Sequence, residues 1–248
     1  MTKVLLVTGA SRGIGAATAG LAAERGYAVC VNYLRNGQAA ERVVADIRNG
    51  GGQAIAVAAD VAKESEVQRL FATIDERLGR VTALVNNAAI LERQSRVEDI
   101  TEERLQRILA TNVVGPFLCA REALRRMSRR HGGSGGAIVN VSSVAARLGS
   151  SGEYVDYAAS KGAIDTFTIG LAREVADEGI RVNAVRPGYI YTDIHAAGGE
   201  PDRVERVKGS LPMRRGGLPQ EVAQAIVWLL SEEASFVTGA FIDLAGGM

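Results

Sequence analysis

The sequence has few cysteines, few aromatic residues and almost no net charge. Only two of its 248 residues are cysteines, and Cys30 and Cys119 lack the spacing of metal ligands, so we expect small buried side chains, with no disulfide framework and no metal site. The 29 basic and 28 acidic side chains leave a formal charge of +1, which offers no broad surface for nucleic acid or anionic lipid. Small-molecule chemistry is therefore the better expectation.

Long apolar runs are also missing. No run approaches the roughly 20 residues that a membrane helix needs. The start, Met1-Thr2-Lys3, leads directly into an apolar stretch too short for the apolar region of a signal peptide. We expect a cytoplasmic protein with no membrane partner and no nucleic-acid partner.

Short apolar runs rich in valine, isoleucine and leucine recur along the chain, separated by segments with helical periodicity. The runs do not alternate with polar residues, and a strand that is apolar on both faces belongs in a parallel sheet covered by helices on both sides. We expect one α/β domain over residues 1–248, a Rossmann-type doubly wound parallel sheet of about seven strands with right-handed crossovers. The predicted strands are 4–7, 28–32, 54–58, 83–85, 137–141, 181–185 and, after a helix at 220–230, 240–243.

The segment 188–215 has a mixed helical pattern that glycine and proline interrupt, and we interpret it as a mobile lid or substrate loop within the domain. We expect His195 in this segment to face solvent, with no part in catalysis. The interrupting residues are Gly198, Gly199, Pro201, Gly209 and Pro212.

A cluster of arginines marks the end of one predicted helix. It could bind nucleic acid, or dock an acidic carrier protein if it lay at the mouth of a site. Positive charge at a helix C-terminus also complements the helix dipole, and we interpret the cluster as a solvated face. The arginines are Arg121, Arg125, Arg126, Arg129 and Arg130.

A glycine-rich turn, Thr8-Gly9-Ala10-Ser11-Arg12-Gly13-Ile14-Gly15, follows the first predicted strand and precedes an alanine-rich helical stretch. Glycines at a strand-to-helix turn let the backbone approach a pyrophosphate, and the helix N-terminus presents free N–H groups to its negative charge. The turn predicts a dinucleotide site formed by Gly9, Ser11, Arg12, Gly13, Ile14 and Gly15.

The end of the second predicted strand decides the form of the cofactor. An acidic residue there would accept hydrogen bonds from the ribose hydroxyls and repel a 2′-phosphate, whereas this chain has Asn32, followed by Tyr33 and Arg35, with Arg12 nearby. We expect NADP(H) in preference to NAD(H). The alternative is that Arg35 is a solvated loop residue.

Tyr157 and Lys161 stand four residues apart at the beginning of a long apolar segment that is predicted to be a helix. Side chains at this spacing share a helix face. A cation near a phenol favours its ionised form, so we expect Lys161 to lower the pKa of Tyr157 toward the range of a general acid or base, with desolvation opposing part of the effect.

Polar side chains follow two other predicted strands at the sheet edge where open α/β sheets place their ligands. Ser143 follows one, and Asn86 and Asn87 end another. Asn112 lies among apolar neighbours in a predicted helix, where a buried amide needs partners. Capping and turn roles, or a helix-internal hydrogen bond for Asn112, are the structural alternatives.

Taken in order, these features resemble the short-chain dehydrogenase/reductase family over essentially the whole chain. The motifs that carry the resemblance are Gly9-Gly13-Gly15, Asp60-Val61, Asn86-Asn87-Ala88, Asn112, Ser143, Tyr157 with Lys161, and Pro187-Gly188.

The resemblance implies roles for these residues. Ser143 would polarise a carbonyl, Tyr157 would transfer the proton, Lys161 would bind the nicotinamide ribose, and Asn112 would hold a water in a relay toward Lys161. Among the cofactor contacts, Asp60 and Val61 would flank the adenine, Asn87 and Ala88 would border the cofactor, and Ile190 and Thr192, after Pro187 and Gly188, would meet the carboxamide. Another surface would cover the apolar 157–175 helix, which in this family implies a homotetramer.

Two features depart from the family pattern or stand out from it. Ala89 replaces a glycine found in many relatives, and its methyl group narrows the approach of backbone to ligand. The stretch between Ser143 and Tyr157 is unusually polar, which could indicate a hydroxylated substrate or only a favourable first helical turn. Its polar residues include Arg147, Ser150, Ser151, Glu153, Tyr154 and Asp156.

Two classes of function fit this sequence. The first is carbonyl reduction or alcohol oxidation with NADP(H), possible forms being a sugar (glucose) dehydrogenase-like enzyme and a 3-oxoacyl-carrier-protein reductase. A non-catalytic dinucleotide sensor is the alternative from another class. Retention of Asn112, Ser143, Tyr157 and Lys161 argues against the sensor.

Overall fold

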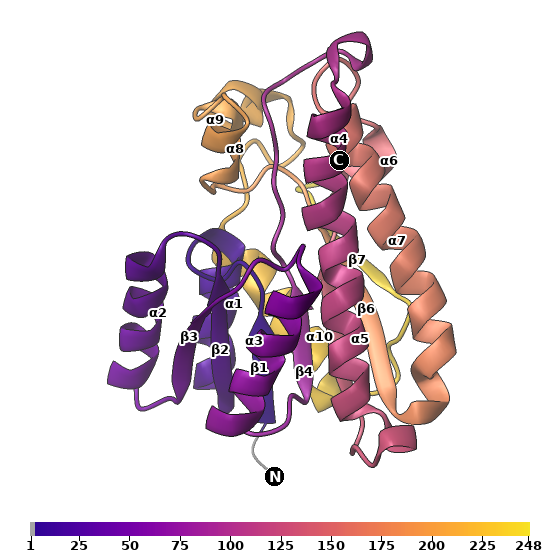
Figure 1. The fold of residues 1–248 in the computed structure, drawn as a ribbon. Coiled ribbons are helices and arrows are strands. Elements are labelled where there is room, and N and C mark those ends of the chain that lie inside the picture. Colours follow the sequence, from indigo (N-terminus) through magenta and orange to yellow (C-terminus); the bar gives the residue numbers. More distant parts are fainter. Residues whose placement is uncertain (1–2) are drawn as a thin grey trace.

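The computed structural model describes residues 3–248, which form a parallel sheet of seven strands with helices on both faces (Figure 1). The strand order is β3-β2-β1-β4-β5-β6-β7, the doubly wound arrangement expected from the apolar runs. The strands are β1 (Lys3–Val7), β2 (Tyr27–Tyr33), β3 (Ala54–Ala58), β4 (Ala83–Asn86), β5 (Gly136–Val141), β6 (Ile180–Pro187) and β7 (Phe241–Leu244). Each predicted strand lies within two residues of an observed one.

The chain reverses its direction of winding at β1, which pairs with β2 on one side and with β4 on the other. The connections on the two sides of such a switch point lead away from each other, which leaves a crevice at the carboxyl ends of the strands. The topology therefore fixes where a ligand site can form.

Longer helices form two layers around the sheet. In Figure 1, α3 and α5 lie in front of the sheet and α1 and α10 lie behind it. The α-helices are α1 (Gly13–Glu24), α2 (Gly37–Asn49), α3 (Glu64–Arg77), α4 (Glu102–Leu109), α5 (Gly115–Met127), α6 (Ala145–Leu148), α7 (Val155–Val175), α8 (Ile194–Ala197), α9 (Arg203–Val207) and α10 (Pro219–Leu230). A π-helical turn, η2 (Ala110–Val114), joins α4 to α5, and the 3₁₀ turns are η1 (Val97–Asp99), η3 (Arg129–His131), η4 (Ala176–Glu178), η5 (Lys208–Ser210) and η6 (Glu232–Ala234).

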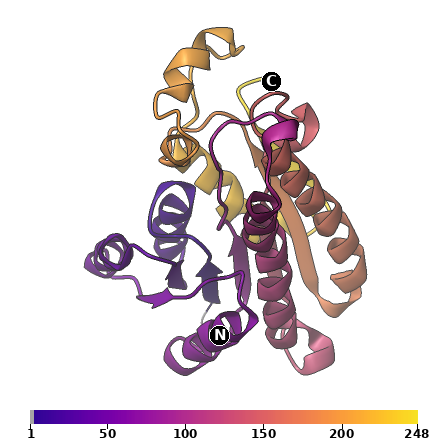
Figure 2. The ribbon, with the colours of Figure 1, turned by 45° about the horizontal axis from the view of Figure 1, so that its top comes forward.

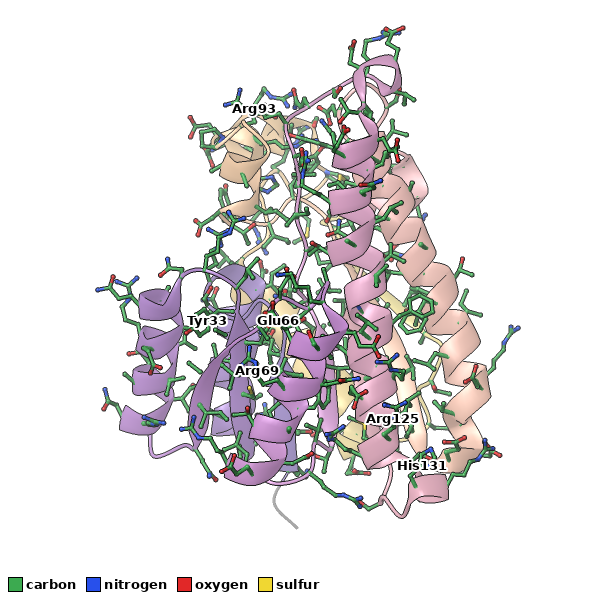
Figure 3. The ribbon with its side chains drawn as sticks, in the orientation of Figure 1. Tyr33, Glu66, Arg69, Arg93, Arg125 and His131 are labelled. Carbon is green, nitrogen blue, oxygen red and sulfur yellow. The ribbon has the colours of Figure 1, made fainter. Side chains whose placement is uncertain are left out.

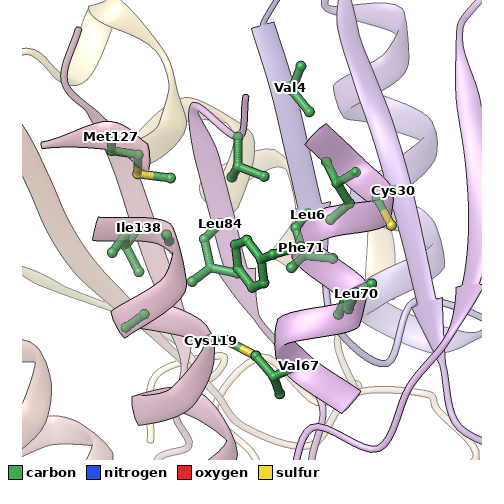
Figure 4. Packing of buried hydrophobic residues seen from close by; sticks show 14 of the residues in the cluster. Val4, Leu6, Cys30, Val67, Leu70, Phe71, Leu84, Cys119, Met127 and Ile138 are labelled. Carbon is green, nitrogen blue, oxygen red and sulfur yellow. The ribbon is translucent and has the colours of Figure 1, made fainter. Parts of the chain in front are cut away.

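Each face of the sheet has its own hydrophobic core. One core joins the strands to α3, α5 and α7, and the other joins them to α1, α2 and α10. Figure 4 shows Phe71 of α3 packed against Leu6 and Leu84 of the strands. Cys30 and Cys119 are free and fully buried in this first core, as expected, and burial raises the pKa of both thiols.

The arginine-rich helix end lies at the edge of the sheet where β5 begins, away from the carboxyl ends. Figure 3 shows Arg125 and His131 at this lower end of the molecule. Acidic neighbours pair with the arginines: Arg121 with Glu64, Arg125 with Glu122, Arg126 with Asp75 and Glu122, and Arg130 with Glu178. The position rules out this cluster as the rim of a site at the other sheet edge.

The segment 188–215 lies beyond the carboxyl ends of the strands and contains α8, α9 and η5 (Figures 1 and 2). His195 of α8 is only 9% exposed, so the expectation that it faces solvent is wrong. The short helix turns its side chain inward, where Nε2 makes a 2.9 Å hydrogen bond with the Ile190 carbonyl.

Within residues 3–248, no helix combines the length and apolar character needed to cross a membrane. The same residues contain no cluster of three or more histidine, cysteine or acidic side chains arranged to hold a metal ion.

Candidate active site

A cavity of about 610 Å³ lies where the carboxyl ends of the strands meet the segment 188–215. Residues at the ends of β1, β2, β4, β5 and β6 line it, although they come from positions far apart in the sequence. All of the predicted cofactor and catalytic residues line this cavity except Gly15 and Asn112. The fold thus brings the sequence motifs to one place.

The glycines of the turn from β1 into α1 (residues 8–15), which we call the phosphate loop, have different tasks. Gly9 and Gly13 have positive φ angles of 62° and 56°, which favour glycine. A Cβ atom on Gly15 would lie 2.6 Å from Nδ2 of Asn87 and 2.7 Å from the Gly9 carbonyl oxygen. Gly15 is therefore required for packing the loop against the turn after β4, behind the cavity wall.

Hydrogen bonds fasten the phosphate loop to the turn after β4. The Thr8 hydroxyl accepts the N–H groups of Asn87 and Ala88, both at 3.0 Å. Nδ2 of Asn87 donates to the carbonyl oxygens of Thr8 and Gly9 at 2.8 and 3.1 Å. The Asn87 side chain therefore shapes the loop and keeps no amide proton free for other partners.

The Asn32 side chain faces the protein interior. Its Oδ1 accepts the Gly9 N–H at 3.2 Å, and its Nδ2 donates to the carbonyl oxygens of Val57 and Ala59 at 3.3 and 3.0 Å. The residue is 1% exposed, and backbone groups of Gly9, Tyr33, Val57 and Ala59 engage its amide. Asn32 therefore fixes the end of β2, and discrimination between cofactors falls to its neighbours.

Those neighbours are cationic and exposed. Arg35 follows β2 on the cavity rim, and Arg12 precedes α1, with its guanidinium 3.8 Å from the Asp193 carboxylate. Tyr33, labelled in Figure 3, also lines the cavity, and its ring lies against Gly37 at the start of α2. Arg12 and Arg35 are the cations available to an anionic group at this end of the cavity.

The loop after β3 is held by its own short contacts. Oδ1 of Asp60 accepts the Ala62 N–H at 3.0 Å, and the Asp60 N–H donates to Glu66, which Figure 3 labels, at 2.8 Å. Val61 is buried beside Gly115, where an added Cβ would lie 2.9 Å from it. Asp60 and Val61 consequently form a fixed part of the cavity wall.

Tyr157 and Lys161 lie on one face of α7, as their spacing predicts, and both line the cavity. Nζ of Lys161 donates to the Val141 carbonyl oxygen at 2.7 Å and lies 5.5 Å from the centre of the Tyr157 ring. Ser143, two residues after that carbonyl, caps the following turn by accepting the Ala145 N–H at 3.1 Å. The three side chains converge from β5 and α7.

Burial dominates the titration of this pair. It raises the pKa of Tyr157 to about 12, opposed by an interaction with the Ser143 hydroxyl, and it lowers the pKa of Lys161 to about 8, opposed by the Asp165 carboxylate. The pKa of Tyr157 thus moves opposite to the expected direction: desolvation raises it, and the group that opposes the rise is Ser143 rather than Lys161. Tyr157 is a protonated phenol at neutral pH.

Asn112 is buried in the π-helical turn between α4 and α5. Its Oδ1 accepts the Ile90 N–H at 2.8 Å, and its Nδ2 donates to the Ile90 carbonyl oxygen and to the Ser160 hydroxyl at 3.0 and 3.1 Å. The amide thus joins two other segments, and the alternative of a helix-internal hydrogen bond does not apply. Pro116, four residues later, has no N–H to donate to the Asn112 carbonyl in the α-helical pattern.

The polar stretch before Tyr157 divides into separate contacts. Asp156 is buried at the start of α7, where its carboxylate accepts the Tyr157 N–H at 2.9 Å and the Nε–H of Arg104 at 2.6 Å. Glu153 pairs with Arg203, and Arg147 pairs with Asp243 on the surface. As expected, an acidic residue, Asp156, lies in the first turn of α7, near the positive end of the helix dipole.

Comparisons with known proteins agree with this geometry. A family model described as enoyl-(acyl carrier protein) reductase matches residues 9–248. The chain is 63% identical over 244 residues to the uncharacterized oxidoreductase YgfF of Escherichia coli, covering 98% of this chain and 99% of that relative. It is 40% identical over 247 residues to a 3-oxoacyl-[acyl-carrier-protein] reductase of Synechocystis, covering 99% and 96%.

The same similarity extends to solved structures. A short chain dehydrogenase from Burkholderia cenocepacia J2315 in complex with NADP superimposes with a TM-score of 0.90 at 32% identity, covering 99% of this chain and 97% of that one. The chain belongs to the short-chain dehydrogenase/reductase family. As a member of this family it is an oxidoreductase that binds a nicotinamide dinucleotide and acts on small molecules.

Three residues were missed in the sequence: Arg203, which lines the cavity, and Asp165 and Arg104, which contact residues in its lining or next to it. Asp165 lies four residues after Lys161 on the same face of α7, accepts the Ser142 hydroxyl at 2.6 Å and pairs with Arg186. The same spacing argument that joined Tyr157 to Lys161 would have found it. Arg104 and Arg203 carried no such signal, because their partners are 52 and 50 residues away in the sequence.

Proposed function

We propose that this protein is an NADP(H)-dependent oxidoreductase that interconverts a ketone or aldehyde and the corresponding alcohol, with Tyr157 as general acid and base. The observation that carries the proposal is the convergence of Ser143, Tyr157 and Lys161 in the cavity that also contains the phosphate loop. Proton transfer and cofactor binding would then take place in one continuous space.

The bound cofactor would supply or accept the hydride. In the reducing direction, Tyr157 enters the reaction protonated, since burial raises its pKa to about 12, and donates its proton to the substrate oxygen. Ser143 lies beside it at the end of β5 and donates a hydrogen bond that polarises the carbonyl. Lys161, held by the Val141 carbonyl, binds the nicotinamide ribose and provides the positive charge nearest to the phenol.

The route of proton replacement runs toward Asn112 in our proposal. The Asn112 side chain is buried outside the cavity lining and both of its amide protons are donated to Ile90 and Ser160, so we do not assign the relay water to this side chain. The backbone carbonyl of Asn112, deprived of an α-helical partner by Pro116, takes that place. Thr111 of the same π-helical turn lines the cavity, so this stretch of backbone borders the site.

We propose NADP(H) as the physiological cofactor, with Arg12 and Arg35 contacting the 2′-phosphate. Both guanidinium groups lie at the adenosine end of the cavity, where the Asn32 amide is directed inward. A kcat/KM that is higher with NADH than with NADPH for the same substrate would overturn this choice.

The test of proton transfer is Tyr157→Phe. We expect this variant to lose nearly all turnover, at least about a hundredfold in kcat, while NADPH binding measured by fluorescence titration is unchanged. Tyr27→Phe is a matched control, because Tyr27 donates to the Leu230 carbonyl on the far side of the fold and does not line the cavity. Retention of more than a few per cent of kcat in Tyr157→Phe would show that Tyr157 is not the proton donor.

A 3-oxoacyl-carrier-protein reductase is the second candidate, favoured by the similarity to the Synechocystis enzyme of that name. The arginine-rich helix end, which could have docked an acidic carrier, lies at the opposite edge of the sheet from the cavity. A non-catalytic sensor is less well supported, because the proton-transfer residues are all present and converge.

We also propose a homotetramer that works in the cytoplasm. Several apolar side chains on α4, η2, α5 and α7 are exposed, and the rings of Phe117 and Phe167 stack at 3.9 Å on this surface. The two free cysteines fit a reducing compartment. Sedimentation of only monomers at micromolar concentration would contradict the tetramer. The exposed side chains are Leu105, Leu109, Val114, Phe117 and Ile169.

A further inference from the structure

The face of α7 that carries Tyr157 and Lys161 has a third polar member one turn further on. Asp165 follows Lys161 by the same spacing with which Lys161 follows Tyr157, so the three side chains share one face of the helix. Tyr157 and Lys161 line the cavity, whereas Asp165 does not. Any effect of Asp165 on the reaction therefore passes through another residue.

Lys161 has little local support for a positive charge. The residue is 3% exposed, and among residues 3–248 its Nζ donates to the Val141 carbonyl oxygen at 2.7 Å and forms no ion pair with a carboxylate. Burial disfavours the charged form of an amine, so it lowers the pKa of Lys161 to about 8, and the Asp165 carboxylate opposes this effect. The ammonium form of Lys161 thus depends on the charges placed around it.

Two contacts hold the Asp165 carboxylate close to Lys161. One of its oxygens accepts the Ser142 hydroxyl at 2.6 Å, and Ser142 directly follows Val141, whose carbonyl oxygen holds Nζ. The other oxygen accepts the Nε–H of Arg186 of β6 at 2.9 Å. The ammonium and the carboxylate are therefore fastened to consecutive residues at the end of β5.

Other charged side chains around this face of α7 pair with one another. The pairs are Arg186 and Arg147 with Asp243 of β7, and Arg104 with Asp156 at the start of the helix. Asp165 is therefore the carboxylate that acts on Lys161, and its partner Arg186 offsets part of its charge.

We propose that Asp165, balanced by Arg186, is a positioning residue that keeps Lys161 in its ammonium form in the wall of the cavity. The proposal rests on the role of Lys161 in the function proposed above. An ammonium group has three N–H donors, so it can hold the Val141 carbonyl, donate toward a ribose and attract the phenolate of Tyr157. A neutral amine would lose that attraction.

Titration of the lysine side chains by NMR tests the proposal without turnover. The sequence contains four lysines, Lys3, Lys63, Lys161 and Lys208, so labelling lysine with ¹³C at Cε gives few signals, and Lys161→Met identifies the one needed. In Asp165→Asn we expect the ratio of ammonium to amine in Lys161 at a given pH to fall at least about tenfold, because a negative charge about 6 Å away is removed. Asp165→Glu should keep the wild-type ratio.

Two further variants separate an effect of charge from a structural role. Arg186→Gln removes the cation that offsets Asp165, so the ratio should rise, whereas simple loosening of the helix would change both variants in the same direction. Glu174→Gln is the matched control, because it removes a carboxylate from an exposed position at the far end of α7 and should leave the ratio unchanged. An unchanged ratio in Asp165→Asn, or a fall in Arg186→Gln, would overturn the proposal. If Asp165→Asn does not fold, the direction of change in Arg186→Gln decides.

The pH profile of turnover connects this titration to the reaction. With ethyl acetoacetate as the carbonyl probe, kcat/KM for reduction should begin to decline with rising pH at least about one pH unit lower in Asp165→Asn than in the wild type, and at a higher pH in Arg186→Gln. A changed ratio with unchanged profiles would overturn the role of Asp165 in the reaction. If the wild-type protein does not reduce this ketone, the proposed function fails for it, and the NMR titration alone decides whether Asp165 sets the charge of Lys161.

Discussion

Replacement of Asn32 by aspartate separates two interpretations of the end of β2. By sequence reasoning alone, an acidic residue at this position should convert the enzyme to NAD(H), since it would contact the ribose and repel a 2′-phosphate. In the structure, however, the side chain points into the protein, where Nδ2 donates to the carbonyl oxygens of Val57 and Ala59. We predict that Asn32→Asp destabilises the fold and does not produce an NAD(H) enzyme.

The size of the effect follows from the contacts of the amide. The substitution removes the hydrogen bonds that Nδ2 donates and sets a carboxylate oxygen against the carbonyl oxygens of Tyr33, Val57 and Ala59 at a position that is 1% exposed. An uncompensated buried charge costs about 3–5 kcal/mol. For a chain of this length, that loss lowers Tm by roughly 6–20 °C.

The loss also has a predicted pH dependence. Burial among acceptors raises the pKa of the new carboxyl group in the folded state above its unfolded value of about 4. Stability is then highest below the unfolded pKa and is lost as the pH rises through the folded pKa. The difference in Tm between Asn32→Asp and the wild type should therefore shrink toward pH 4 and be largest at neutral pH.

Thermal unfolding followed by circular dichroism measures this prediction, together with kcat/KM for both cofactors. Arg35→Ala is the matched variant: Arg35 is exposed on the cavity rim, so its loss should weaken the preference for NADPH and leave Tm unchanged. A stable Asn32→Asp variant that prefers NADH would refute our reasoning, because it would place the side chain at the ribose.

Two further predictions concern the helix that carries Tyr157. Because the pKa of Tyr157 is raised to about 12, the phenol is protonated at neutral pH. Alcohol oxidation needs the phenolate, so its kcat/KM should rise with pH by up to about tenfold per unit between about pH 6 and 8. The kcat/KM for carbonyl reduction should change little over the same range. A flat oxidation profile from steady-state rates would contradict this. Arg104→Met should destabilise the protein by about 3–5 kcal/mol, because it leaves the buried Asp156 carboxylate without its cation, and Arg104→Met combined with Asp156→Asn should recover most of that loss in urea unfolding. Equal stability of the single and double variants would show that the ion pair does not hold the start of α7.

The elements that the sequence predicted well depend on local chain geometry. The strands were recognisable because a residue run that is buried on both faces must be apolar throughout, and all seven lie within two residues of their predicted places. The Tyr157 and Lys161 side chains share a face because an α-helix repeats every 3.6 residues, whatever surrounds it. The phosphate loop was predictable because glycine, which has no Cβ atom, adopts positive φ angles regardless of its tertiary surroundings.

The errors and omissions concern contacts between distant segments. The inward direction of Asn32 depends on β3 and the phosphate loop, and the burial of His195 depends on how the short helix α8 packs over the cavity. The pKa of Tyr157 depends on how much solvent the surrounding elements exclude, and the spacing of Tyr157 and Lys161 in the sequence does not show that.

The sequence by itself determined the parallel fold, the glycine-rich loop after β1 and the shared helix face of Tyr157 and Lys161, because each follows from a repeat or a backbone preference within a few residues. Only the tertiary structure decided which side chains face the cavity. His195 and Arg203 line the same cavity as Tyr157 and Lys161 because the segment 188–215 contacts the residues just before α7, and no local pattern encodes that contact.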